Sequence, residues 1–119
     1  MATIEQVRPL DLQAWFARHS TGGVPVVLDV REPWEWQTAR VASSPSYELV
    51  HCSMRSLAAY LEQASPLTPE RPIACLCHHG QRSMHVAQFL AQQGFTRLAN
   101  IAGGIQAWAE QLDPKVPKY

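Results

Sequence analysis

The sequence predicts an α/β protein built on a parallel sheet, and three observations lead to that class. Residues 24–30 and 73–76 are almost entirely apolar runs, as in strands that are covered on both faces. Between such runs the apolar residues recur every three or four positions, which is typical of amphipathic helices. Strand and helix patterns alternate along the chain, so we expect a five-stranded parallel sheet with helices on both faces.

Each expected element follows from a local pattern and a stop signal. The expected strands, in chain order, are residues 3–7, 24–30, 47–51, 73–76 and 97–101. The expected helices are residues 9–19, 33–38, 54–61, a helix from Arg82 or Ser83 to Gln93, and residues 105–112. Gly94 is a typical left-handed C-terminal stop, and Pro114 cannot continue the last helix.

Length and composition favour one globular domain over residues 1–119, with residues 113–119 as an extended C-terminal tail. The chain has 119 residues, of which 46% are apolar and 17% charged, and its ten basic side chains balance ten acidic ones. This balance argues against nucleic acid or an anionic membrane as a partner. Three cysteines without an export signal indicate reduced thiols, so we expect a cytoplasmic protein. Because the domain is short and neutral, we expect a monomer.

A cysteine at the end of the fourth strand is the strongest candidate nucleophile. Cys77 is followed by a polar turn that contains Gly80 and leads to Arg82. Cysteine reacts as the thiolate, which a free thiol with a pKa of about 8.5 supplies sparingly at neutral pH. The N-terminus of the next helix, the Arg82 cation and convergent backbone N–H groups around Gly80 all favour an anion here. An inert, buried Cys77 is the alternative.

Other cysteines and histidines allow weaker interpretations. Cys75, Cys77, His78 and His79 lack the paired spacing of a zinc site, so we expect no metal and assign Cys75 to the core. Cys52 ends the third expected strand. It could act as a resolving thiol that turns a persulfide into a disulfide, but a small packing residue is the simpler interpretation.

Three stretches together identify a resemblance that covers nearly the whole chain. They are LDVREPWEW (28–36), CHHGQRS (77–83) and NIAGGIQAW (100–108). In this order and spacing the chain resembles single-domain rhodaneses, a family of sulfurtransferases. The resemblance implies a rhodanese-like fold and a persulfide on Cys77 that moves sulfur from a donor such as thiosulfate to a nucleophilic acceptor. The region 38–54 lacks the His-Ile-x-Gly-Ala stretch of many members, which leaves substrate preference open.

The predicted site is centred on the loop after Cys77. We expect the loop residues His78, His79, Gly80, Gln81 and Arg82 to bind the persulfide through their backbone N–H groups, with Ser83, Asp29 and Arg31 in supporting roles. Arg82 either anchors the loop or attracts an anionic donor. The side chains of the two histidines either assist the chemistry or are simply solvated.

Two groups beside the second strand have open roles. Asp29 could accept backbone N–H bonds while Arg31 pairs with Glu32 or Glu35, which makes both structural. Trp34 and Trp36 could form a pocket wall or a docking face, although such tryptophans more often fill gaps between helix and sheet.

Sulfur transfer is the leading functional hypothesis, with a small donor and either a small acceptor or a sulfur-carrier protein as partners, and no cofactor. The alternatives are a non-catalytic binding module whose tail docks on a partner, and a cysteine phosphatase or arsenate reductase. Phosphatase loops place five residues between cysteine and arginine, whereas four separate Cys77 from Arg82. Because a phosphoryl group presents three oxygens, it needs a wider ring of donors than one sulfur anion.

Overall fold

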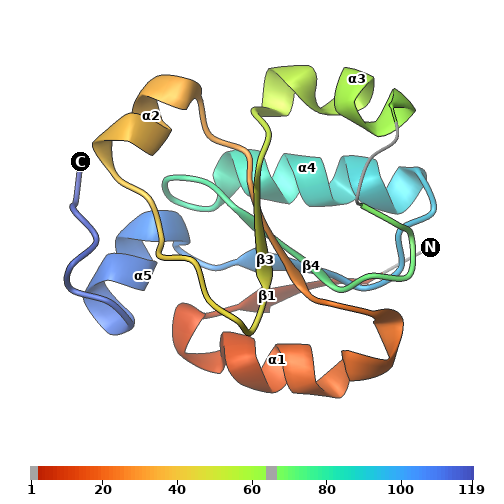
Figure 1. The fold of residues 1–119 in the computed structure, drawn as a ribbon, viewed down its shortest axis with the longest axis horizontal. Coiled ribbons are helices and arrows are strands. Elements are labelled where there is room, and N and C mark those ends of the chain that lie inside the picture. Colours follow the sequence, from red (N-terminus) through yellow and green to blue (C-terminus); the bar gives the residue numbers. More distant parts are fainter. Residues whose placement is uncertain (1–2, 64–66) are drawn as a thin grey trace.

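The computed structural model describes residues 3–63 and 67–119 and contains a five-stranded, fully parallel sheet (Figure 1). The strand order is β1-β5-β4-β2-β3, and every neighbouring pair is parallel. The strands are β1 (Ile4–Val7), β2 (Val26–Asp29), β3 (Glu48–His51), β4 (Ile73–Leu76) and β5 (Leu98–Ile101). The α/β class predicted from the sequence is confirmed.

Helices cover both faces of this sheet. They are α1 (Leu12–Arg18), α2 (Pro33–Thr38), α3 (Leu57–Glu62), α4 (Gln81–Gln92) and α5 (Gly104–Gln111), with 3-10 turns at Pro9–Asp11, Ser20–Gly22 and Met54–Ser56. In Figure 1, α1 and α5 lie on one side of the strands, and α3 and α4 lie on the other. The helix expected at 54–61 begins as a 3-10 turn, and α4 begins one or two residues earlier than expected.

The hydrophobic core consists of two layers, one on each side of the sheet. Trp15 of α1 and Trp108 of α5 pack in the first layer, and Leu57 of α3 and Leu90 of α4 pack in the second. All residues of β2, β4 and β5 are buried. Successive strand residues point to opposite faces, so both layers draw on the same strands, which explains their continuous apolar runs.

Residues 113–119, expected to be an extended tail, turn back along the domain. The Val116 N–H donates to the Asp113 carbonyl oxygen over 3.1 Å, and the Val116 side chain is buried in the first core layer. Tyr119 thereby reaches the carboxyl ends of the strands, where its ring and hydroxyl contact residues of the predicted site. Separately, no helix in the described part of the chain is both long and apolar enough to cross a bilayer.

Candidate active site

Cys77 lies directly after β4, at the bottom of the predicted loop, and only 1% of its surface is exposed. Its Sγ accepts a hydrogen bond from the Gly80 backbone N–H over 3.0 Å and lies 3.3 Å from the Ser83 hydroxyl oxygen. The cysteine therefore packs within the second core layer, yet its sulfur has two polar neighbours that suit an anion. We call residues 77–82 the Cys77 loop.

Gly80 gives the loop its shape. It has a φ of +104° and is the N-cap of α4, a backbone conformation that residues with a Cβ rarely adopt. This turn directs the Gly80 N–H back toward Sγ while its carbonyl oxygen accepts from Asn100 Nδ2 over 2.9 Å. The N–H group of Gly80 is thus fixed by the sulfur, and its carbonyl group is fixed by Asn100 of β5.

Ser83 and Asn100 form a buried polar pair behind the sulfur. The Ser83 hydroxyl lies 2.5 Å from Asn100 Oδ1, and both residues are almost fully buried. Asn100 Nδ2 also donates to Gln6 Oε1 over 3.0 Å, which leaves Asn100 Oδ1 facing Ser83 as an acceptor. The single Ser83 proton can thus point to Asn100 while the oxygen accepts from a Cys77 thiol, or turn to a Cys77 thiolate.

The first turn of α5 holds the opposite side of the loop. The backbone N–H groups of Ile105 and Gln106 donate to the carbonyl oxygens of Cys77 and His78 over 2.8 and 3.3 Å. Gly104 precedes them with a φ of +64°, and a Cβ there would lie 2.3 Å from the His78 carbonyl oxygen. The stretch NIAGGIQAW therefore places the first turn of α5 in direct contact with the main chain of Cys77 and His78.

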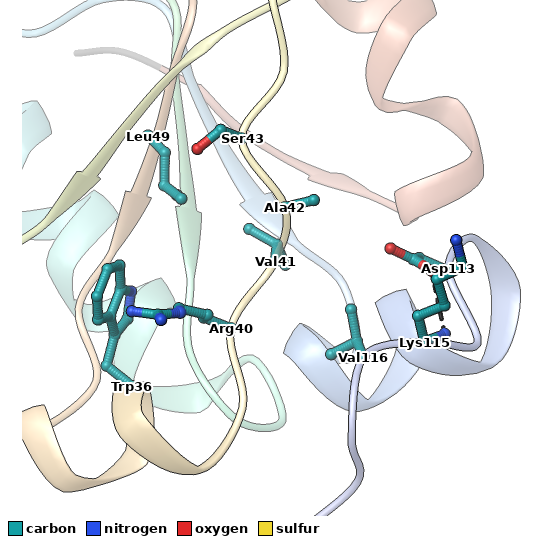
Figure 2. A pocket seen from close by; sticks show the side chains of 9 residues that line it. All are labelled: Trp36, Arg40, Val41, Ala42, Ser43, Leu49, Asp113, Lys115 and Val116. Atoms are coloured by element: carbon teal, nitrogen blue, oxygen red, sulfur yellow. Dashed lines mark hydrogen bonds between the residues drawn. The ribbon is translucent and has the colours of Figure 1, made fainter.

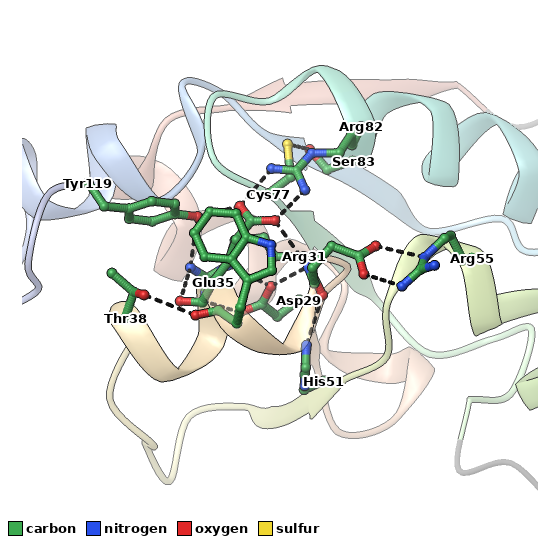
Figure 3. A network of polar contacts seen from close by, with 12 residues as sticks. Asp29, Arg31, Glu35, Thr38, His51, Arg55, Cys77, Arg82, Ser83 and Tyr119 are labelled. Carbon is green, nitrogen blue, oxygen red and sulfur yellow. Dashed lines mark hydrogen bonds and ion pairs between the residues drawn. The ribbon is translucent and has the colours of Figure 1, made fainter.

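Arg82, at the end of the loop, is anchored by an ion pair. Its Nη1 and Nη2 donate to the two carboxylate oxygens of Glu35 over 2.6 and 2.8 Å (Figure 3). Hydrogen bonds from Arg82, and then from Tyr119, lower the Glu35 pKa to about 2 despite burial. Glu35 is therefore ionised at neutral pH and balances the charge of Arg82. The structure thus favours the anchoring role of Arg82 over a free anion-binding role.

Asp29 and Arg31 form a fully buried pair at the end of β2. Arg31 Nε and Nη2 donate to the two Asp29 carboxylate oxygens over 2.9 and 2.7 Å, and the Arg31 N–H also donates to Asp29 Oδ1. The expected pairing of Arg31 with the side chain of Glu32 or Glu35 is wrong. Arg31 contacts Glu35 only at its backbone carbonyl oxygen, since the Glu35 carboxylate is occupied by Arg82.

The two histidines of the loop stack on each other and on Tyr119. The His78 ring lies 3.9 Å from the rings of both His79 and Tyr119, in nearly parallel planes. Burial, and next the neighbouring His79, lower the His78 pKa. His79 Nε2 lies 2.9 Å from Gln106 Oε1 on α5. His78 is therefore a neutral, half-buried packing residue at pH 7, and neither ring is simply solvated.

The remaining cysteines and tryptophans lie outside this hydrogen-bond network. Burial raises the pKa of Cys75 to about 12 and also raises that of Cys52, which disfavours thiolate chemistry at either residue. Trp34 is exposed and meets the Tyr119 ring edge-on at 6.1 Å. Trp36 stacks against His51 at 5.1 Å.

Two surface pockets show where a small molecule could be held. One, of about 530 Å³, borders the Cys77 loop and is lined by residues that include His79, Gly80, Gln81 and Asn100. The other, of about 570 Å³, lies between Trp36 with Arg40 and the segment around Val116, and contains none of the predicted site residues (Figure 2). Only the first borders the loop that carries the cysteine.

The structure brings together most of the predicted residues and adds three whose roles at the site the sequence did not reveal. Glu35 holds Arg82, and Asn100 holds the carbonyl oxygen of Gly80. Tyr119 holds the carboxylate of Glu35. Asn100 carried a signal, because a polar residue inside a buried strand needs a partner. Glu35 sat within the quoted stretch LDVREPWEW. Tyr119 carried no local signal.

Comparisons with known proteins place the chain in one domain family. The family model described as "Rhodanese-like domain" matches residues 12–111. A chloroplastic rhodanese-like/PpiC domain-containing protein of Arabidopsis thaliana is 39% identical over 94 residues, which cover 78% of this chain but only 30% of that longer protein. The thiosulfate sulfurtransferase GlpE of Coxiella burnetii is 34% identical over 83 residues, 70% of each chain.

Solved structures share the fold. A rhodanese-related protein of Thermoplasma volcanium superposes with a TM-score of 0.68 at 26% identity, covering 97% of this chain and 99% of its own. A protein of Rhodopseudomonas palustris described as a possible tyrosine phosphatase has a TM-score of 0.67 at 24% identity, covering 98% and 85%. The second likeness concerns the fold alone, so the chemistry has to be argued from the site.

Proposed function

Because this chain belongs to the rhodanese-like domain family, we propose that it is a sulfurtransferase that carries sulfane sulfur as a persulfide on Cys77. The observation that carries the proposal is the pair of donors on Sγ, the Gly80 N–H and the Ser83 hydroxyl. The Gly80 N–H is a fixed donor that needs no reorganisation to stabilise an anion, and the Ser83 proton turns from Asn100 to Sγ when the thiol ionises. The likeness to a thiosulfate sulfurtransferase supports thiosulfate as one donor.

The reaction consists of two balanced displacements at sulfur. The Cys77 thiolate attacks the outer sulfur of thiosulfate, the sulfur–sulfur bond of thiosulfate breaks, and sulfite leaves with the bonding electron pair. Cys77 then carries a terminal sulfur anion. A nucleophilic acceptor such as cyanide or a thiolate attacks that terminal sulfur, and the Cys77 thiolate is released unchanged. Neither step needs a metal or an external oxidant.

Two small molecules suffice as partners in this scheme, and a sulfur-carrier protein could replace the acceptor. The three cysteines are all free thiols, which fits a reducing compartment such as the cytoplasm. The 530 Å³ pocket beside Gly80 and Asn100 is a reasonable entry for a small acceptor.

Mass spectrometry of the purified protein after incubation with thiosulfate tests the proposal. We expect the protein to gain the mass of one sulfur atom, the Cys77→Ser variant to gain none, and the wild type to form thiocyanate from thiosulfate and cyanide. Cys52→Ser is the matched control, because Cys52 is also buried but lies outside the network. Sulfur retained by Cys77→Ser would disprove the assignment.

The same preparation separates the competing hypotheses. A non-catalytic module would take up no sulfur from any donor, and a phosphatase would hydrolyse p-nitrophenyl phosphate faster than it forms thiocyanate. Increased sulfur retention in Cys52→Ser relative to wild type would show that Cys52 resolves the persulfide.

A further inference from the structure

The guanidinium of Arg82 is the cation that lies nearest to Cys77 in the polar network around the site. In Figure 3 the Arg82 head group lies beside the Cys77 sulfur. Arg82 is about one third exposed, whereas its partner Glu35 is almost completely buried. The net charge at this approach therefore depends on how firmly the Glu35 carboxylate stays on Arg82.

Tyr119 also holds that carboxylate, at the same oxygen that accepts from Arg82 Nη2. Its hydroxyl donates to Glu35 Oε2 over 2.6 Å and accepts from Arg31 Nη1 over 3.0 Å. Arg31 is itself fixed by the fully buried pair with Asp29. A continuous chain of contacts thus connects the rigid end of β2, through the phenol, to the last residue of the Cys77 loop.

The ring of Tyr119 fixes the position of that hydroxyl. It stacks on His78 at 3.9 Å with an interplanar angle of 8° and meets Trp34 edge-on. Val116, three residues earlier, anchors the segment in the core. The phenol is therefore held by the loop on one side and by the buried Arg31 on the other, and its orientation is not left to solvent.

We propose that Tyr119 is a positioning residue that sets the charge selectivity of the Cys77 site by keeping Glu35 on Arg82. With Tyr119 in place the guanidinium is compensated, and anionic reagents gain little over neutral ones. Without its hydroxyl the carboxylate loses one of its anchors, and Arg82 attracts anions more strongly. The consequence for sulfur donors rests on the proposed function: loss of the hydroxyl should favour dianionic thiosulfate over persulfide donors of lower charge.

The test compares how fast Cys77 is alkylated by iodoacetate, which is anionic, and by iodoacetamide, which is neutral. Changes in loop opening affect both reagents alike, so their rate ratio reports charge. Glu35→Gln should raise the iodoacetate-to-iodoacetamide ratio about fivefold, the effect of one unit charge at about 4 Å in water. Tyr119→Phe keeps the ring and should raise the ratio about twofold, since it weakens the pair without removing it.

Tyr60→Phe is the matched control for the loss of a hydroxyl. Tyr60 lies at the other end of the fold on α3, and its hydroxyl makes no hydrogen bond to any described residue. We expect its alkylation ratio to equal that of the wild type. In the double variant Glu35→Gln/Tyr119→Phe, the ratio should match that of Glu35→Gln alone, because Tyr119 acts through Glu35.

Three outcomes would overturn the proposal: an unchanged ratio in Tyr119→Phe, an unchanged ratio in Glu35→Gln, or independent multiplication of the two effects in the double variant. An unchanged ratio in Glu35→Gln would overturn the proposal even if Tyr119→Phe does not fold. Steady-state sulfur transfer adds a second readout, a lower KM for thiosulfate in Tyr119→Phe with little change in kcat. If no donor transfers sulfur, the proposed function is wrong. The alkylation ratios still test the role of Tyr119, because they do not depend on sulfur transfer.

Discussion

Substituting Gly104 by alanine tests whether the first turn of α5 shapes the Cys77 loop. A Cβ at Gly104 would lie 2.3 Å from the His78 carbonyl oxygen and 2.5 Å from the Cys77 carbonyl oxygen. Ordinary contacts need at least about 3.4 Å, so the loop main chain would have to move by roughly 1 Å. These atoms belong to backbone that is hydrogen-bonded to α5, and they cannot rotate away as the end of a side chain could.

The expected loss in the free energy of unfolding has two parts, and the same substitution at a second glycine distinguishes them. Overpacking costs about 1–3 kcal/mol, and a left-handed backbone costs an alanine about 1–2 kcal/mol. Gly94 provides the matched control, because it has a φ of +96° but no atom within 4 Å of the position that a Cβ would occupy. Gly94→Ala should therefore lose only the conformational part, and Gly104→Ala should be less stable than Gly94→Ala by about 1–3 kcal/mol.

Urea denaturation measures the free energies of unfolding of the two variants. The rate of persulfide formation shows whether the Cys77 loop keeps its shape. A displacement of about 1 Å in a reacting group can lower a rate about a hundredfold. We expect that loss in Gly104→Ala and a rate near that of the wild type in Gly94→Ala. If the two variants were equally stable and equally fast, α5 would have no part in shaping the site.

Three further predictions concern the polar groups around the sulfur. The lowered Glu35 pKa of about 2 means that ionised Glu35 stabilises the fold above about pH 4.5 and that this stability is lost as the pH falls toward 2. Urea denaturation should show that Glu35→Gln lacks this loss, which is on the order of 3 kcal/mol, and parallel curves would contradict it. Asp29→Asn leaves the Arg31 charge buried without a partner and should lower the free energy of unfolding by about 3–5 kcal/mol. Asp11→Asn, in an exposed pair with Arg8, should lower it far less, and equal costs would refute the argument. Ser83→Ala removes a donor from Sγ and should slow alkylation of Cys77 by iodoacetamide about fivefold at neutral pH; an unchanged rate would show that the hydroxyl does not stabilise the thiolate.

The fold was predictable because its signals are local and repeated. The continuous apolar run that became β2 (Val26–Asp29) and the helical stripe that became α5 (Gly104–Gln111) each identify their element without reference to the rest of the chain. Element ends depend on contacts between elements. Gly80, for example, caps α4 because Asn100 fixes its carbonyl oxygen, so the sequence placed that helix start one or two residues late.

The site was predictable only where its residues are neighbours in the sequence. Cys77, Gly80 and Ser83 fall within seven residues, and their contacts follow from one turn. Tyr119 reaches Glu35 across 84 positions, and no periodicity encodes such a contact. Arg31 shows a different limit. Two glutamates lie within four residues of Arg31 in the sequence, but in the fold the Arg31 backbone N–H and its guanidinium both donate to the Asp29 carboxylate.

The way Arg82 is held also bears on the choice between sulfur and phosphoryl chemistry. An arginine that binds a phosphoryl group must offer its forked N–H groups to the oxygens of that group, but both Nη atoms of Arg82 already donate to Glu35. A phosphate would have to displace a buried carboxylate that Tyr119 also holds. The Cys77 thiolate makes no such demand, since the Gly80 N–H and the Ser83 hydroxyl already face Sγ. The same ion pair that makes Arg82 a poor phosphate ligand therefore leaves it well suited to keep a short loop closed around one sulfur anion.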